Sequence, residues 1–232
     1  YAEYAFSLND HDHNFKFMVG YNQEKKHSKY FYIARKNLID ANNPQLSLAT
    51  GDRLSGSSES QWAVNGVFAR INYDYQNKYL LELDSRYDGS SKFKSGERYS
   101  FFPSASAAWR ISEEPFFKPL KSWWDNMKIR VSYGSLGNQV VNSDFPYLAT
   151  YGVNAQYGVM LGGSLPVAIS APGLVSPSFT WETVDQLDFG FDASFLHDRL
   201  NTSFDWYRRD TKDMLTSGEV LPAVLGASTP LE

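Results

Sequence analysis

In residues 186–196, Gln-Leu-Asp-Phe-Gly-Phe-Asp-Ala-Ser-Phe-Leu, polar or small side chains alternate with apolar ones up to Phe195. Leu187 and Phe189 fall on one side of this alternation, and Asp188 and Asp192 fall on the other. Successive side chains of a β-strand point to opposite faces of the sheet. The stretch therefore predicts a strand with one apolar face and one charged face.

The same period of two recurs along most of the chain. Further stretches show it at residues 4–8, 15–22, 66–75, 81–88, 103–112, 128–133 and 200–206. Several approach or reach the roughly 9–11 residues that a tilted strand needs to cross a bilayer. The sequence therefore predicts an all-β fold, an antiparallel meander of about eight strands.

Composition excludes several classes of protein. The 232 residues carry 22 basic and 26 acidic side chains, a formal net charge of −4, whereas a nucleic-acid binder normally presents a basic face. No cysteine is present, which excludes disulfide frameworks, thiolate metal sites and cysteine nucleophiles. No run of about 18 apolar residues encodes a transmembrane helix. Aromatic residues nonetheless make up 16% of the chain, so its apolar content is rich in rings.

The connections between the predicted strands alternate in length. Short turns rich in Asn and Asp are expected at residues 9–13, 76–78 and 197–199. Long polar loops are expected at about 23–60, 88–98 and 135–180. This alternation gathers the short turns at one end of the sheet, as in transmembrane barrels with short periplasmic turns and longer extracellular loops.

One connection departs from this alternation. Residues 113–126 should lie at the short-turn end, yet the segment is of middling length and contains Pro115 and Pro119. It predicts an ordered turn that includes a short helical piece.

The charged face of the strands is the candidate functional surface. Alternation alone leaves a membrane barrel and a soluble β-sandwich open, because both use sheets with one polar face. The polar faces here are strongly charged and suit a water-filled lumen, while the apolar faces carry Leu, Val, Ala and rings that can contact lipid. The lumen-facing candidates are Glu82, Asp84, Arg86, Arg110, Arg130, Asp188 and Asp192. Aromatic residues that fit the headgroup level are Tyr73, Tyr75, Tyr79, Trp109, Phe195 and Trp206.

Four longer stretches resemble SusC/RagA-like TonB-linked outer-membrane transporters. They are INYDYQNKYLLELDSRYDGSSKF at residues 71–93, YSFFPSASAAWRISEEPFF at 99–117, WWDNMKIRVSYGSLGNQ at 123–139 and WETVDQLDFGFDASFLHDRLNTSFDWYRRDTKDML at 181–215. The stretches occur in the family's order and at plausible spacing. The resemblance is weak over residues 23–60 and 145–180, which are expected to be variable loops on the ligand side.

This resemblance implies a TonB-energised importer of oligosaccharides or peptides in a Gram-negative outer membrane. Members form a 22-stranded barrel around a plug and work with a SusD-like surface lipoprotein. No TonB box, plug or C-terminal aromatic strand is recognised in this sequence. Residues 1–232 are therefore expected to be one segment of the barrel wall, embedded in the bilayer. This segment is expected to reach TonB only through other parts of the transporter.

The sequence predicts binding and translocation rather than bond chemistry. No catalytic residue, metal site or cofactor is expected, and His11 and His13 are interpreted as part of a solvated turn. Rings in loops can stack on sugars or on peptide side chains. The loop ligand-contact candidates are Trp62, Tyr147, Tyr151 and Tyr157.

Two alternatives remain open from the sequence. A soluble carbohydrate-binding β-sandwich with aromatic loops would use the same alternation. A small barrel that closes on its own, as an adhesin or a structural protein, would need about eight strands.

Overall fold

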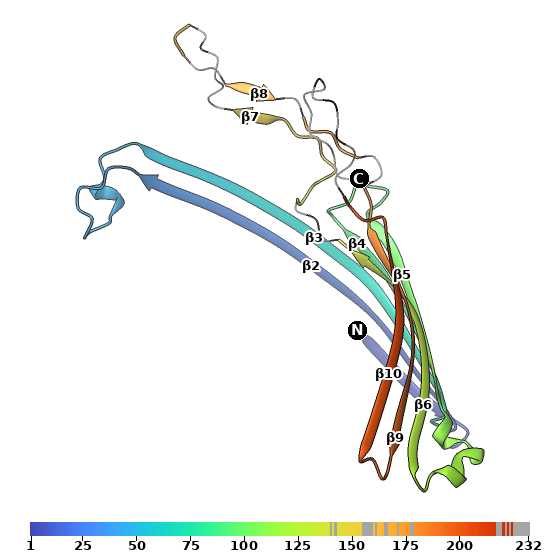
Figure 1. Ribbon diagram of the computed structural model, residues 1–232. Helices are drawn as coiled ribbons and strands as arrows, with labels where there is room; N and C mark the ends of the chain where they lie inside the picture. Colours follow the sequence, from blue (N-terminus) through green and yellow to red (C-terminus); the bar gives the residue numbers. More distant parts are fainter. Residues whose placement is uncertain are drawn as a thin grey trace.

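A computed structural model describes residues 1–139, 141, 143–154, 160, 162–164, 167–170, 172–176, 179–216, 220, 222 and 224. Eight strands form one antiparallel sheet in the order β1-β2-β3-β4-β5-β6-β9-β10 (Figure 1). Their bounds are β1 Ala2–Leu8, β2 His13–Arg35, β3 Arg53–Tyr75, β4 Tyr79–Ser90, β5 Tyr99–Arg110, β6 Trp124–Asn138, β9 Glu182–Phe195 and β10 Leu200–Lys212. Every strand pairs with its neighbours along the chain once the β7–β8 insertion is set aside, which confirms the predicted meander.

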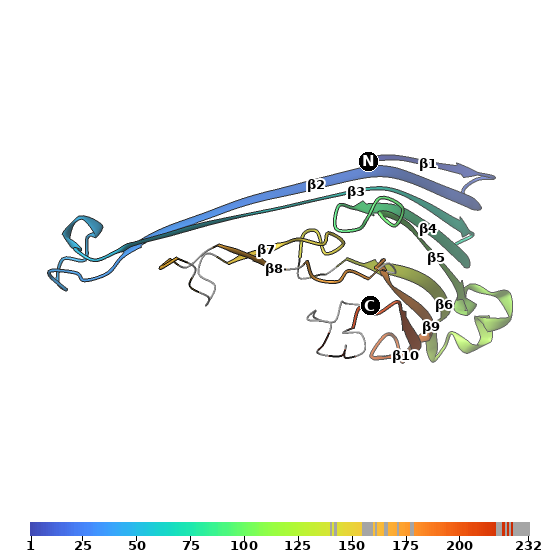
Figure 2. The same ribbon diagram turned by 90° about the horizontal axis from the view of Figure 1, so that it is seen from above.

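The sheet is a single curved layer. Seen from above, the strands follow an open arc from β1 to β10 (Figure 2). In the described part of the chain the other sheet has only two short strands, β7 Gly152–Asn154 and β8 Ala168–Ser170, so no second layer packs on the arc. This arrangement excludes a β-sandwich and is that of a partial barrel wall.

The apolar side of the arc is left uncovered. Val67, Leu83, Val131 and Phe189 occupy this side in four different strands and keep 41–49% of their surface exposed. A soluble sheet buries such a face against another element. No described helix is both long enough and apolar enough to span a membrane.

The predicted loop over residues 23–60 is wrong. Strands β2 and β3 each continue for 23 residues and stay paired up to Arg35 and Arg53, so only residues 36–52 connect them. The outer half of this hairpin projects beyond the rest of the sheet (Figure 1). Its strands were missed because both of their faces are mostly polar and carry no apolar period of two. The tip contains a short 3-10 helix, η1 Leu46–Leu48.

The short turns lie together at the opposite end from this tip. Residues in the turns have positive φ angles, including Asn9, Asp10, Asn77 and Asp198, in the left-handed region that Asn and Asp tolerate. The β5–β6 connection holds two 3-10 helices, η2 Ile111–Glu113 and η3 Pro115–Leu120, which confirms the predicted ordered turn. Three of the connections at this end are therefore tight, and the fourth is folded.

The hydrophobic core lies at the long-connection end and not between layers. Phe93 from the β4–β5 loop packs with Phe102, Phe179 and Trp181, and all four rings are buried. The Trp181 indole N–H donates to the Arg98 carbonyl at 3.3 Å. This cluster fixes the β4–β5 loop to the segment that leads into β9. The β6–β9 connection begins after Asn138 rather than at residue 135, since β6 continues to that residue.

Candidate functional site

Strand register places all seven predicted lumen-facing residues on one face of the sheet. One row of cross-strand partners runs Glu82–Ser106–Ser132–Asp188 from β4 to β9. The other candidates occupy alternate positions of the same strands, so their side chains share the face of that row. The members outside this row are Asp84, Arg86, Arg110, Arg130 and Asp192.

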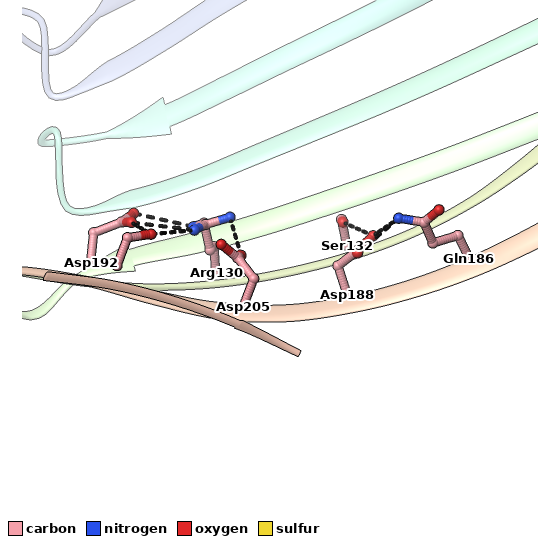
Figure 3. A network of polar contacts seen from close by, with 7 residues as sticks. Arg130, Ser132, Gln186, Asp188, Asp192 and Asp205 are labelled. Atoms are coloured by element: carbon pink, nitrogen blue, oxygen red, sulfur yellow. Dashed lines mark hydrogen bonds and ion pairs between the residues drawn. The ribbon is translucent and has the colours of Figure 1, made fainter. Parts of the chain in front are cut away.

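Arg130 forms the centre of a charged network across three strands (Figure 3). Its guanidinium donates from Nε to Asp192 Oδ2 at 3.1 Å and from Nη2 to Asp192 Oδ1 at 3.2 Å. Its Nη1 lies 2.8 Å from Asp205 Oδ1. Ser203 joins the network by donating to Asp192 Oδ1 at 3.1 Å. The fork of one arginine therefore ties β6 to both β9 and β10.

Gly190 makes the contact between Arg130 and Asp205 possible, which crosses the intervening strand β9. In register it lies between Arg130 on β6 and Asp205 on β10. A Cβ atom at this position would lie 2.6 Å from Asp205 Oδ1 and 2.9 Å from Arg130 Cζ. The missing side chain thus leaves the space through which Arg130 crosses β9.

A second polar group lies farther along the same strands. Ser132 donates to Asp188 Oδ2 at 3.2 Å, and the Gln186 amide donates to both Asp188 oxygens at 2.9 and 3.1 Å (Figure 3). Gln186 in turn accepts from Arg209 Nη2 at 2.9 Å. The face is therefore lined by connected polar groups over much of its height.

The β3 and β4 side of the face follows the same pattern. Arg70 forms an ion pair with Asp84. Arg86 forms a bidentate pair with Asp88 on its own strand, with two hydrogen bonds of 2.9 Å. The Arg86 guanidinium also lies 5.5 Å from the centroid of the Phe68 ring. Such stacking adds to the ion pair and fixes the side chain against the wall.

Arg110 and Lys128 differ from Arg70, Arg86 and Arg130 on this face. They are direct cross-strand partners, and neither side chain has a hydrogen-bond or ion-pair partner within the described ranges. Both line a shallow hollow of about 640 Å³ near the short-turn end, together with Lys16, Asp74 and Glu82. Charged and polar side chains line this hollow, and it can hold water and charged groups.

The four aromatic candidates differ in where the structure places them. Trp62 lies in β3 and not in a loop, on the same face as the charged residues. Asp144 accepts from the Gln61 backbone N–H at 2.8 Å, which holds the segment carrying Tyr147 next to Trp62. Tyr151 is strongly exposed just before β7. Tyr157 lies outside the described residues.

The candidate set omitted residues that the structure brings into the site. Arg70 and Asp205 bear the same charges and occupy the same face as the predicted residues. Asp205 could have been found from the alternation of residues 200–206, where it opposes Phe204 and Trp206. Phe68 could not, because a ring at a polar position breaks the pattern.

The chemistry available on this face is hydrogen bonding and ion pairing. Its side chains are carboxylates, guanidiniums, amides and hydroxyls, most of them engaged with each other and partly exposed to solvent. Among the described residues no group of three His, Asp or Glu side chains is arranged to hold a metal ion. The face can solvate and orient a polar ligand that passes along it.

Comparison with known proteins identifies the sheet. Residues 1–230 match the family described as TonB dependent receptor-like, beta-barrel. TonB-dependent receptor P26 of Formosa agariphila is 33% identical over 196 residues, which cover 84% of this chain and 19% of that protein. TonB-dependent receptor SusC of Bacteroides thetaiotaomicron is 35% identical over 153 residues, 66% of this chain and 15% of SusC.

Solved structures give the same fold. The RagAB peptide transporter aligns with a TM-score of 0.85 at 24% identity, covering 99% of this chain and 25% of the matched chain. The RagAB peptide importer in its "open-open" state aligns with a TM-score of 0.84 at the same identity. The chain thus spans about a fifth of the length of the curated relatives and a quarter of the solved chains that it matches.

Proposed function

This chain belongs to the TonB-dependent receptor β-barrel family, and from that premise we propose that it forms part of the wall of an outer-membrane importer. Its apolar face contacts lipid, and its charged face lines a water-filled passage. The chain acts by binding and guiding a solute, and the energy comes from TonB through parts of the transporter outside these residues.

One observation carries this proposal. The two faces of a single sheet require different solvents, since the apolar face is uncovered and the other face carries the Arg130–Asp192–Asp205 network. In hydrocarbon, unpaired backbone amides cost several kcal/mol each, so only a closed ring of strands is stable there. The edges of β1 and β10 are accordingly closed by further strands of the same barrel.

The proposed cargo is an oligosaccharide or a peptide. The similarity to the RagAB peptide transporter supports a peptide. The oligosaccharide is the other class that the resemblance to SusC/RagA-like transporters implies. Both are rich in hydrogen-bonding groups, which suits a wall of paired charges. Trp62, Tyr147 and Tyr151 are proposed as ring contacts for such a solute at the long-connection end. Tyr157 is proposed as a ring contact from the sequence alone.

The proposed partner is a SusD-like surface lipoprotein. It would meet the long-connection end, where the β2–β3 hairpin and the paired strands β7 and β8 project (Figure 1). Purification of the full-length protein from outer membranes tests this: a lipoprotein should be retained at a stoichiometric ratio. Loss of a retained lipoprotein upon removal of residues 30–58 would locate the contact on the hairpin.

Cysteine labelling tests the membrane assignment directly, because the chain has no cysteine of its own. Single cysteines at Ile129, Arg130, Val131 and Ser132 are treated with a membrane-impermeant maleimide in intact outer-membrane vesicles. Positions 130 and 132 should react, and positions 129 and 131 should be protected. Equal labelling of all four would contradict a lipid-facing apolar side.

A further inference from the structure

The β5–β6 connection lies on the outer side of the arc at the short-turn end (Figure 2). We name residues 111–123 the interfacial segment. At the short-turn end, the outer face carries a row of rings. Tyr75 stacks on Tyr79 and Tyr79 stacks on Trp109, each with centroids 6.2 Å apart. The segment therefore borders the belt of aromatic residues that fits the level of lipid headgroups.

The interfacial segment is held firmly to the wall. Phe117 is buried and packs edge-on against Trp124 at 5.3 Å between centroids. Ser112 donates to the Asn126 side-chain oxygen at 2.8 Å. These contacts come from both 3-10 helices, so the segment has a fixed orientation relative to the sheet.

Glu114 adds a carboxylate clamp. Its Oε1 accepts from the Tyr79 hydroxyl at 2.7 Å and from the Trp109 indole N–H at 3.1 Å. These two donors, chiefly the tyrosine, hold the pKa of Glu114 below its ordinary value. Glu114 lies between η2 and η3, so the clamp fixes the junction of the two helices to the wall.

The segment exposes a group of three apolar side chains together with two lysines. Phe116 is 64% exposed, Leu120 37% and Trp123 49%, although the neighbouring Phe117 is buried. Trp123 stacks on Phe195 of the outer face at 6.1 Å, so this group continues the lipid-facing surface. Lys118 and Lys121 flank it; Lys121 has a 3.4 Å contact with Glu113, in which both side chains are more than two-fifths exposed.

We propose that the interfacial segment is a membrane-surface anchor that binds anionic phospholipid on the short-turn side of the bilayer. Phe116, Leu120 and Trp123 enter the boundary between headgroups and acyl chains. Lys118 and Lys121 bind the lipid phosphate. To do so, Lys121 gives up its contact with Glu113, which is exposed and therefore weak. This inference rests on the proposed membrane position of the sheet.

Lipid is favoured as the occupant by continuity and by charge. A ring on the outer face that stacks with Trp123 belongs to the surface assigned to lipid, so a protein partner would have to displace lipid there. Amphipathic segments with aromatic residues on one side and lysines at the edge bind at bilayer surfaces through buried apolar area and attraction to anionic lipids.

Spin labels measure the depth of the segment. Cysteines at Phe116 and Leu120 of the full-length protein in nanodiscs should carry labels that collide more with oxygen than with a water-soluble nickel complex. A label at Phe31 on the projecting hairpin should show the reverse. A label at Phe189 in the middle of β9 reports the membrane position itself.

These positions separate two kinds of failure. Labels at Phe116 and Leu120 in water, with Phe189 in lipid, would overturn the anchor and leave the barrel assignment intact. Labels at Phe189 and at both segment positions in water would overturn the proposed function. Labels at all three positions in lipid support the anchor.

Lipid retention tests the lysines. The double variant K118Q/K121Q is compared with K25Q/K26Q, which removes two lysines from the hairpin. In nanodiscs of phosphatidylglycerol and phosphatidylethanolamine, native mass spectrometry should show several-fold less retained phosphatidylglycerol for K118Q/K121Q only. Equal retention of phosphatidylglycerol in the two double variants, or a loss confined to phosphatidylethanolamine, would overturn the phosphate contact.

Discussion

The two ends of the sheet are stabilised in different ways. At the short-turn end, rings and the Glu114 carboxylate tie neighbouring strands to each other through side chains. At the other end, the outer half of the β2–β3 hairpin pairs with no further strand among the described residues and is held by its own ladder of backbone bonds. The aromatic cluster around Trp181 is the core of this long-connection end, and the projecting hairpin is not part of it. The difference indicates that the short-turn end is built to stay fixed, and that the other end carries parts that can be changed without loss of the wall.

The largest effect on stability is expected in the aromatic core around Trp181 at the long-connection end. Trp181→Ala removes a buried ring that contacts Phe93 and Phe102. Truncation of such a ring typically costs about 3–5 kcal/mol, because a cavity remains. Thermal unfolding of the detergent-solubilised full-length protein should show this loss, and limited proteolysis should cut residues 91–98 faster. Phe31→Ala on the hairpin is the matched control and should change neither.

A charge on the outer face should have the next largest effect. Val131→Arg places a guanidinium on the lipid side of β6, which costs about 2–4 kcal/mol near the bilayer midplane. Ser132→Arg, one residue away on the inner face, should be tolerated beside Asp188. Heat-modifiable migration on gels and yield in the membrane fraction measure both variants. A greater loss for Ser132→Arg would reverse the assignment of the two faces.

Removal of Arg130 should cost less. Arg130→Met leaves Asp192 and Asp205 without their shared cation, and partly exposed ion pairs of this kind contribute about 1 kcal/mol or less. Arg208→Met serves as the control, because Arg208 pairs only with Asp210 on its own exposed strand end. The midpoint of thermal unfolding should fall for Arg130→Met and not for Arg208→Met. Equal midpoints would show that the network does not join the strands.

Much of this wall could be predicted from the sequence because alternation is a local property. Residues 186–196 alone define a strand and place Asp188 and Asp192 together on its charged face. The Arg130–Asp205 pair could not be predicted, since it crosses an intervening strand at Gly190 and depends on register. The packing of Phe93 on Trp181 joins two loops far apart in sequence, and no periodic signal encodes it.

The extent of the hairpin was underestimated for a related reason. Residues 23–35 and 53–60 form strands whose stability comes from pairing with each other and not from an apolar face. A period-two pattern reports burial or lipid contact, and neither applies to a ribbon that projects from the sheet. Trp62 was assigned to a loop through the same error.

Acid should weaken the short-turn end through Glu114. Because its pKa is lowered in the folded protein, the ionised clamp stabilises fully above the ordinary carboxyl value of 4.5, and this contribution disappears as the pH falls through the lowered value. The midpoint of thermal unfolding of Glu114→Gln should therefore be slightly lower than that of the wild-type protein near neutral pH. The difference should vanish in strong acid. A constant difference at every pH would indicate that charge on Glu114 is not involved.

The smallest effect on stability is expected from shortening the hairpin. Lys29 and Glu59 are cross-strand partners, so residues 30–58 can be replaced by Asn-Gly, a pair that favours the tight turn of a two-residue hairpin. The removed part pairs with no other strand that the structure describes, and surface changes away from special features usually stay within about 0.5 kcal/mol. The unfolding midpoint and heat-modifiable migration should match those of the wild-type protein. A large loss of stability would mean that the projecting half supports the wall, and the contrast between the two ends would then be wrong.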